Sequence, residues 1–424
     1  MDRARHRISP RRSTCKGSDS WYAGQAPNLS GLVSAVTDVP VNPKVLIWAR
    51  LERGFDVPGA AARLGVPEEE LLELESGARH PSVGELRNMS AKYEIGFSSL
   101  LMPDVLPSET RLKLQDFRTH GSGAPGKWNP ELLMEMDDIN VLIDAMADLR
   151  DADPALFANK LPKASFATGA EKVAVDERSR VGLDVSTQAA WKTDATAFKT
   201  LRSLVEAQGV FVYQVNASTT DDWRGMAIFD ERKIPVIVIN SNEAFPAARS
   251  FTLFHEYAHL LLRQSAITDH RSRDANEEYC NKFAAYFLMP AQEFRGAALS
   301  VGGGFRNYWT DTHLRKIGGV FKTSMSAVAL HLENLDLAPD GFFNVKVSEW
   351  RVREKKDSKP PIVPYYDKIA NRLGVQHIKV VLEALDRKRI NQLDAFEMLD
   401  VQASNFAKLR AKIMEREAGF GWRP

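Results

Sequence analysis

The spacing of apolar residues predicts a group of short helices near the N-terminus. Apolar residues recur every three or four positions in PKVLIWARLERG, VPGAAARLG, PEEELLELESG and SVGELRNMSAKY, and Gly or Pro separates these segments. This is the periodicity of amphipathic helices with breakers between them. We therefore expect four or five helices that form an all-α bundle over residues 43–102.

The middle of the chain mixes helical and strand patterns. Residues 131–150 and 193–209 have helical periodicity, and FVYQV, RGMAIF and PVIVIN then predict three short strands. FTLFHEYAHLLL and ANEEYCNKFAAYFLMP follow, with apolar positions that suit two buried helices. We expect residues 131–340 to form one helix-rich α+β domain with a small sheet.

The C-terminal region, residues 341–424, is predicted to be mainly helical. FFNVKVSEWRV predicts a strand and KKDSKPPIVP an exposed linker, whereas YYDKIANRLG, VQHIKVVLEALDRKR and QLDAFEMLDVQASNFAKLRAKIMERE are amphipathic helices. The last of these contains a small-residue helix, a turn and a second helix. Two interpretations stay open, a second helix-turn-helix or a helical cap on the preceding domain.

Two segments lack the pattern of a folded element. Residues 1–42 begin with a polar stretch whose first 20 residues carry a net charge of +4, and we expect this basic tail to be disordered. Residues 103–130 are rich in Pro and Gly and are predicted to be a linker. The fold class that results is multidomain: a helical bundle, an α+β domain and a helical C-terminal region.

Composition and charge restrict the class of protein. Hydrophobic residues make up 44% of the chain and charged residues 26%, which is ordinary for a soluble protein. We expect no membrane contact, because no apolar run is long enough to span a bilayer, and no secretion, because no signal-peptide core follows the basic N-terminus. Two cysteines, Cys15 and Cys280, predict no disulfide framework, so we expect a cytoplasmic protein. Residues 346–424 carry a net charge of +6, which suits either DNA contact or a solvated surface.

Two histidines and a glutamate interrupt an otherwise apolar helix. His255 and His259 are four residues apart, which puts both imidazoles on one helix face, and Glu256 lies beside them. A buried helix with satisfied histidines is the alternative, but the pair favours a metal site. Zinc in a hydrolase takes three protein ligands. Glu277 and Glu278 at the start of the next helix are the candidates, and spacing does not choose between them.

The motifs resemble the ImmA/IrrE metallopeptidases over about residues 195–295, with FTLFHEYAHLLL, ANEEYCNKFAAYFLMP and the upstream RGMAIFDERKIPVIVINSNEAFPAARS. The resemblance implies a zincin-like domain with one Zn²⁺ per chain. It implies His255, His259 and Glu277 as ligands, because Glu277 lies four residues before Asn281. Asn281 would orient Glu277 across one helical turn.

The same resemblance implies roles in catalysis. Glu256 would accept a proton from a water activated by the metal and pass it to the leaving amine of a peptide. Cys280 is predicted to be a small core residue. Several other groups could stabilise an oxyanion, but core or surface positions fit each of them better: Tyr257, Tyr279, His270, His313 and His331.

The N-terminal segment AARLGVPEEELLELESGARHPSVGELRNMSAKY resembles the Xre-type helix-turn-helix of phage and plasmid repressors. The helix that reads bases in that family here carries five carboxylates: Glu68, Glu69, Glu70, Glu73 and Glu75. Phosphates repel carboxylates, so direct DNA reading by this helix is disfavoured. The alternative is a docking module for a protein or for the chain's own catalytic part.

These expectations combine into a zinc-dependent regulatory endopeptidase. The resemblance implies a protein substrate, a helix-turn-helix repressor whose cleavage derepresses stress-response or mobile-element genes. The alternative is a DNA-binding transcription regulator or antitoxin-like protein with a structural or sensory zinc fold. DNA would then be bound through the helix-turn-helix or the basic C-terminal region. A homodimer is compatible with either interpretation, and hydrolysis of a non-peptide amide or ester at the same zinc is a third.

Overall fold

The structure, a computed structural model, describes residues 38–105, 130–157, 160–216, 224–229, 234–243, 245–263, 270–301, 308–351 and 363–419. The chain divides into two compact units, one within residues 1–111 and 127–134 and one that contains residues 135–424. Most of the predicted tail and linker lie outside the described residues, and the predicted domain limits stay predictions. Among the described residues, none of the helices has the length and hydropathy needed to cross a membrane.

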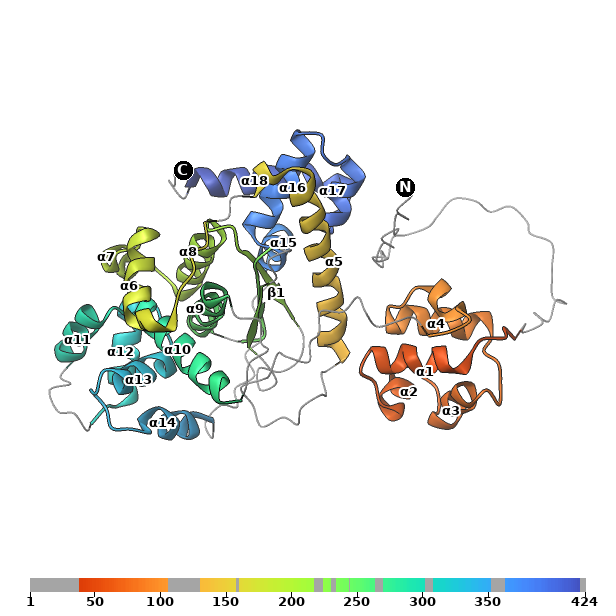
Figure 1. The fold of residues 1–424 in the computed structure, drawn as a ribbon, viewed down its shortest axis with the longest axis horizontal. Helices are drawn as coiled ribbons and strands as arrows, with labels where there is room; N and C mark the ends of the chain where they lie inside the picture. The colour runs from red at the N-terminus through yellow and green to blue at the C-terminus, as the bar shows by residue number, and fades with distance from the viewer. Residues whose placement is uncertain are drawn as a thin grey trace, which may run out of the picture. The chain divides into compact units, whose positions relative to one another are not determined.

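The N-terminal unit is a bundle of short helices (Figure 1). A side chain accepts a hydrogen bond from a backbone N–H at the start of three of them, through Asn42, Asp56 and Ser82, and thereby satisfies groups that a helix end leaves free. The elements are α1 (Pro43–Glu52), α2 (Val57–Leu64), α3 (Glu68–Ser76), α4 (Val83–Tyr93) and the 3₁₀ helix η1 (Phe97–Leu101). The expectation of four or five short helices is confirmed.

Helices α2 and α3 are joined by a tight turn at Gly65, which has φ +75° and can adopt this value because it lacks a Cβ. Ala60 and Ala61 on α2 are buried in the core of the unit. The order of helix, glycine turn and helix fits the predicted helix-turn-helix, whose identity stays a prediction.

The five carboxylates of α3 do not share one environment. Glu75 is 7% exposed and accepts hydrogen bonds from Nε and Nη2 of Arg50 at 2.7 and 2.9 Å. Glu70 accepts one from Arg79 at 3.1 Å. Glu75 therefore does not contribute to the charge on the surface of α3, because Arg50 on α1 holds it inside the bundle.

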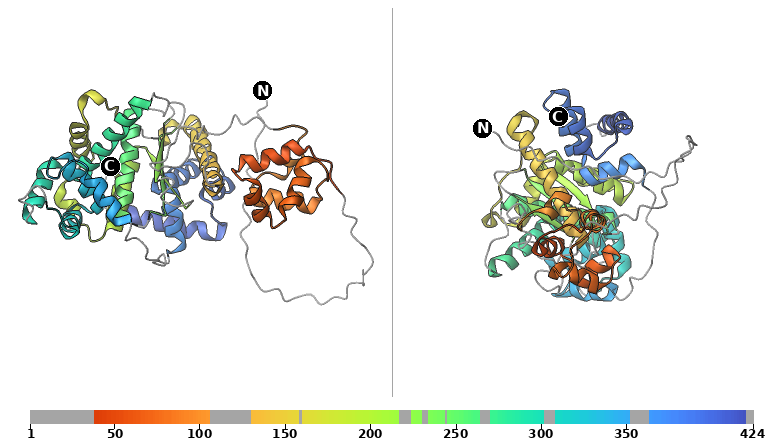
Figure 2. Two further views of the ribbon diagram at one scale, coloured as in Figure 1. Left: turned by 90° about the horizontal axis from the view of Figure 1, so that it is seen from below. Right: turned by 90° about the vertical axis from the view of Figure 1, so that its right-hand side faces the viewer.

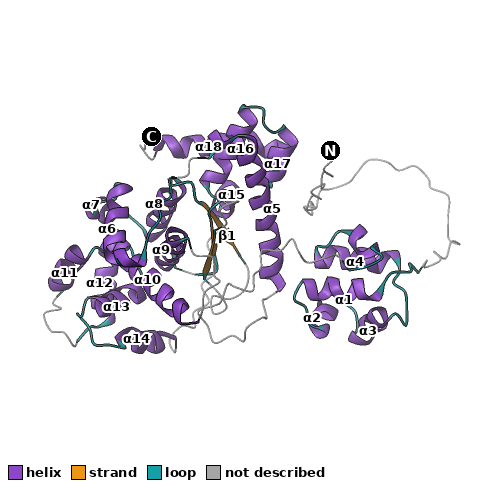
Figure 3. Ribbon diagram, viewed as in Figure 1, coloured by secondary structure: helices purple, strands orange, loops and turns teal. Residues whose placement is uncertain are grey.

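The larger unit is helix-rich around one small sheet (Figure 3). This confirms the expectation of a helix-rich α+β domain with few strands. Its helices before the sheet are α5 (Pro130–Ala152), α6 (Ala170–Arg180), α7 (Val185–Ala190) and α8 (Asp194–Glu206), with 3₁₀ turns at Pro154–Leu156 and Phe166–Thr168. Those after it are α9 (Pro246–Leu262), α10 (His270–Leu288), α11 (Ala291–Ser300), α12 (Asp311–Phe321), α13 (Met325–Asn334), α14 (Phe342–Arg351), α15 (Tyr365–Leu373), α16 (Val375–Asp386), α17 (Gln392–Leu399) and α18 (Ala403–Gly419).

The sheet contains the three predicted strands in the order β1-β3-β2. Strand β1 (Phe211–Val215) is parallel to β3 (Val236–Asn240), and β2 (Gly225–Ile228) is antiparallel to β3. Every residue of β1 and β3 is buried, as expected for strands covered on both faces. Strand β2 therefore forms one edge of the sheet.

Helix α9 packs against strands β2 and β3, and α8 and α10 pack against α9. Helix α5 lies on the opposite side of the sheet from α9 (Figures 1 and 2). The core of this unit joins residues of α8, α9, α10, α12 and α13 to the inner strands. Helix α9 is thereby held on all sides.

The C-terminal helices α15 and α16 pack against β1 and belong to the same compact unit as the sheet. Arg202 on α8 donates a hydrogen bond to the carbonyl of Asn371 at the end of α15, at 2.7 Å. It also pairs with Glu206, which accepts from the backbone N–H of Val375 at 3.2 Å. The β1 edge of the sheet is thereby covered by the chain's own helices.

The strand predicted in FFNVKVSEWRV was wrong, because these residues form helix α14. The alternating valines suit a strand, but Glu333 of α13 accepts hydrogen bonds from the backbone N–H groups of Gly341 and Phe343, at 3.0 and 2.9 Å. A carboxylate at this position satisfies the free N–H groups of a first helical turn. Phe342, Phe343 and Trp350 also pack against the core. Tertiary contacts therefore decide the local structure.

Candidate metal centre

The two histidines lie on a helix that is buried along almost its whole length. Helix α9 begins at Pro246, where the N–H that proline lacks would have no partner within the helix, and it ends at Leu262. Arg263 follows with a φ of +49°. Twelve of its 17 residues are buried. His255 and Glu256 are 5% and 7% exposed. The packing around α9 holds both side chains in place.

The third predicted ligand comes from α10, which packs along α9. Cys280, Phe283, Ala284 and Phe287 are buried on this helix. Glu277, one turn before them, lies next to the histidines. Glu278 instead is exposed and accepts a hydrogen bond from Lys282 at 2.6 Å. Of the two candidates that the spacing left open, the structure brings Glu277 to the histidine pair.

The three groups are separated by the distances that a single metal ion requires. Nε2 of His255 and Nε2 of His259 are 3.2 Å apart, and they lie 3.2 and 3.5 Å from the two oxygens of Glu277. One ligand atom from each residue lies within 4.8 Å of the others. Tetrahedral zinc with bonds of about 2.0–2.1 Å has ligand atoms about 3.3 Å apart. The donor set and its spacing fit zinc.

Asn281 orients the first histidine. Its amide oxygen lies 3.0 Å from Nδ1 of His255, and because this oxygen only accepts, Nδ1 carries the proton. The lone pair of His255 then lies on Nε2, which is the atom that faces His259 and Glu277. Asn281 was expected to orient Glu277 on its own helix, whereas the structure gives it a contact across to α9.

The electrostatics of the group favour a cation. Burial lowers the pKa of His255, but its hydrogen bond to Glu277 and the charges of Glu256 and Glu277 outweigh this and raise the pKa above its ordinary value. Two carboxylates therefore concentrate negative charge around the imidazoles. A divalent cation would satisfy this charge as a proton does.

The side chain of Glu256 borders the edge strand of the sheet. A Cβ built on Gly225, the first residue of β2, would lie 3.1 Å from Cγ and 3.2 Å from Oε1 of Glu256. The backbone of β2 therefore passes directly beside this carboxylate. No pattern in the sequence predicted this contact, because 31 positions separate the two residues.

Comparison with known proteins assigns the region around this site. Residues 206–333 match the model of the peptidase family M78, the IrrE N-terminal-like domain. This part of the chain is similar to IrrE. The match begins at the end of α8 and runs through the sheet, α9 and α10 to α13. Among curated proteins, none matches the chain.

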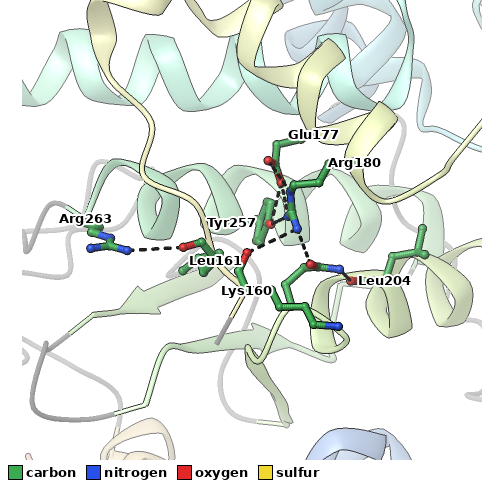
Figure 4. A network of polar contacts seen from close by, with 8 residues as sticks. Lys160, Leu161, Glu177, Arg180, Leu204, Tyr257 and Arg263 are labelled. Atoms are coloured by element: carbon green, nitrogen blue, oxygen red, sulfur yellow. Dashed lines mark hydrogen bonds and ion pairs between the residues drawn. The ribbon is translucent and has the colours of Figure 1, made fainter. Parts of the chain in front are cut away.

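A polar network fixes helix α9 of the IrrE-like domain to helix α6 (Figure 4). Tyr257 donates a hydrogen bond to Glu177 at 2.9 Å and accepts one from Arg180 at 3.0 Å, and Arg180 also pairs with Glu177 at 2.6 Å. Both partners are on α6. Tyr257 is 2% exposed and takes part in this anchor, so the core position expected for it agrees with the structure.

The other groups considered from the sequence do not join the metal-binding group. His331 is buried between the rings of Tyr286 and Phe294, and His313 forms part of the N-terminal cap of α12. Cys280 is buried, and its burial raises the pKa of the thiol well above its usual range, as a core residue requires. The side chain of His270 lies outside the described residues, as does Cys15.

Proposed function

We propose that this protein is a zinc-dependent peptidase with its site at His255, His259, Glu277 and Glu256. The observation that carries the proposal is the spacing of 3.2 to 3.5 Å between the two imidazoles and the Glu277 carboxylate. The similarity of residues 206–333 to peptidase family M78 supports it.

The residues present would divide the chemistry between them. His255, His259 and Glu277 would hold the ion, and Asn281 would keep Nε2 of His255 available. Bound Zn²⁺ supplies a Lewis acid that lowers the pKa of water and polarises a carbonyl. The carboxylate of Glu256 would accept the proton of the attacking water and donate it to the leaving nitrogen.

The edge strand supports a peptide as the substrate. The N–H of Asn240, at the end of β3, donates to the carbonyl of Arg224 at 2.8 Å. In an antiparallel pair, a residue bonded in this way turns both its N–H and its C=O toward the neighbouring strand, and every second residue does so. The alternate residues, Gly225 and Ala227, then turn theirs away from β3, and Gly225 lies beside Glu256. No further strand pairs with this edge among the described residues. An extended peptide could add to it through main-chain hydrogen bonds.

We further propose that the substrate is a helix-turn-helix repressor and that the protein is a regulatory endopeptidase. The resemblance to the ImmA/IrrE metallopeptidases implies this substrate class, and the match of residues 206–333 to an IrrE N-terminal-like domain supports the resemblance. In this proposal the N-terminal unit recruits the substrate, since its exposed α3 carboxylates suit a protein better than DNA.

The test maps new protein N-termini in cells that express wild type, Glu256→Gln or Glu278→Gln. Glu256→Gln removes the proton acceptor and keeps the three ligands, and Glu278→Gln is the matched control on the exposed side of α10. We expect new N-termini with wild type and the control, absent with Glu256→Gln. Three identical profiles, under resting and stressed conditions, would contradict a peptidase.

A further inference from the structure

We propose that Gly225 is a positioning residue for Glu256. In this proposal, which rests on the proposed peptidase function, the absence of a side chain at position 225 lets the open edge of β2 lie against the Glu256 carboxylate. The edge that would bind the peptide and the group that would move the proton are thereby held together. Residue 225 thus acts through the space that its missing side chain leaves, and contributes no side-chain group of its own.

The space beside Gly225 is too small for a methyl group. A Cβ at this position would lie 2.7 Å from Cγ2 of Thr252, in addition to its contacts at 3.1 and 3.2 Å with Glu256. Thr252 and Glu256 are one turn apart on α9 and face β2 together. Any larger residue must therefore move the strand, the helix or the side chains of both Thr252 and Glu256.

The neighbours of Gly225 cannot easily give way. Thr252 donates its hydroxyl to Glu243 at 3.1 Å, which fixes the rotamer that directs Cγ2 at Gly225. Glu243 is 7% exposed and lies 3.7 Å from Arg224, the residue before Gly225. This carboxylate therefore links the start of β2 to α9.

The strand and the helix are also fixed on their other sides. Met226 and Ile228 are buried, and β2 is paired with β3 along its length. Helix α9 is anchored to α6 by the hydrogen bond from Tyr257 to Glu177. Glu256 meets the added methyl group with the end of a flexible side chain and not with its backbone, so we expect the methyl group to displace its carboxylate.

The experiment compares Gly225→Ala, Thr252→Ser and the double variant Gly225→Ala/Thr252→Ser. Serine at position 252 keeps the hydroxyl that donates a hydrogen bond to Glu243 and lacks Cγ2. The double variant therefore relieves the contact at 2.7 Å and keeps the contacts of the new methyl group with Glu256. Gly296→Ala is the matched control, because a Cβ there meets nothing within 4 Å. Three properties are measured: melting temperature, Co²⁺ affinity with the visible spectrum of bound Co²⁺, and the cleavage that Glu256→Gln abolishes.

We expect the double variant to have the melting temperature of wild type and to bind Co²⁺ with wild-type affinity. Its Co²⁺ spectrum should shift in the direction that Glu256→Gln shifts it, and cleavage should fall about tenfold or more, as for a misplaced general base. Wild-type cleavage in the double variant would overturn the proposal, because the contact with Thr252 alone would then explain Gly225. Absence of Co²⁺ binding or of cleavage in wild type would instead overturn the proposed function and, with it, this inference.

Discussion

At the scale of single residues, the site depends on which nitrogen of His255 is available. Asn281 fixes the proton on Nδ1 and leaves Nε2 for an ion. Contacts of this kind orient a metal-binding imidazole without touching the metal. In the proposed zinc site, the amide of Asn281 would therefore contribute to metal affinity from outside the set of ligands.

Asn281→Ala is expected to weaken zinc binding about 10- to 100-fold, because the ring of His255 loses its orientation. Competition with a chromogenic chelator measures the affinity. The neighbouring variant Lys282→Ala, which removes only an exposed ion pair with Glu278, should leave it unchanged. Equal affinities for both variants and wild type would show that Asn281 does not orient the ligand.

The sequence identifies the metal-binding residues better than their surroundings. The histidine pair follows from helical periodicity, but spacing leaves Glu277 and Glu278 equivalent, and the resemblance to a family was needed to choose. The crowding of Gly225 against Glu256 and Thr252 has no local signal, because it depends on the separate positions of a strand and a helix. A glycine at the start of a short strand reads equally as a turn residue.

Another buried histidine, His377, fixes the C-terminal helices. His377 donates Nε2–H to the carbonyl of Met398 at 3.0 Å and accepts at Nδ1 from the hydroxyl of Tyr213, also at 3.0 Å. Burial lowers the pKa of His377 to about 4. Only the neutral imidazole can make both bonds, since the charged form has no acceptor.

Stability should accordingly fall in mild acid. The pKa of His377 is lower in the folded than in the unfolded protein, so its contribution is complete above the unfolded value of about 6.5 and is lost as pH falls toward 4. From pH 7 to pH 5 the loss is about 2 kcal/mol. Urea unfolding of wild type and His377→Gln measures it. The variant should lose less stability than wild type between pH 7 and pH 5. His331 also has a lowered pKa, but it is present in both proteins, so its contribution cancels in the difference. An equal loss of stability in both proteins would show that groups other than His377 cause it.

At the scale of elements, α3 takes the place of the recognition helix in the predicted helix-turn-helix, but its surface is unsuited to DNA. Glu68, Glu69 and Glu73 are exposed, and Leu72 beside them is 48% exposed. Glu75 could have been assigned to the same face from the sequence, but it is part of the core. Only the exposed carboxylates would meet a phosphate backbone.

Replacing Glu68, Glu69 and Glu73 together with glutamine is expected to increase the affinity of the full chain for duplex DNA, because the repulsion of the phosphates is removed. Fluorescence anisotropy at 50 and 200 mM salt measures the effect, which should shrink at the higher salt. A decrease in affinity would mean that these carboxylates contact bases, and would favour the DNA-binding regulator.

Helix α14 marks the limit of periodicity as a predictor. Val345 and Val347 alternate with polar residues, so the pattern favours a strand, while the carboxylate of Glu333 stabilises the first turn of a helix. The other predicted strands and long helices were confirmed, because their burial and their periodicity agree. The prediction fails where a contact from another element outweighs a weak local preference.

At the scale of the larger unit, the two edges of the sheet differ. Helices α15 and α16 cover β1, whereas the outer side of β2, away from β3, has no strand partner among the described residues. Gly374, at φ +82°, joins these two helices, and a Cβ there would collide with the carboxylate of Glu206. The C-terminal helices thus fit closely against α8 and the sheet.

Removal of residues 363–424 is therefore expected to destabilise the metal centre as well as the C-terminal region. It would expose the β1 edge and leave Arg202 and Glu206 without their partners at Asn371 and Val375. Gel filtration and zinc content of the truncated protein measure this, with Gly296→Ala as a well-folded reference. A monomer with full zinc content would show that the helices are dispensable.

The open edge of β2 has a consequence for the timing of cleavage. A strand edge pairs only with extended backbone, so a segment of the proposed repressor substrate that is helical in its folded state would first have to open locally. The free energy of that opening, a property of the substrate, then enters the rate directly. Regulation could thus act without any change in the peptidase: whatever loosens the repressor, such as release from DNA or loss of a partner, would expose it to cleavage.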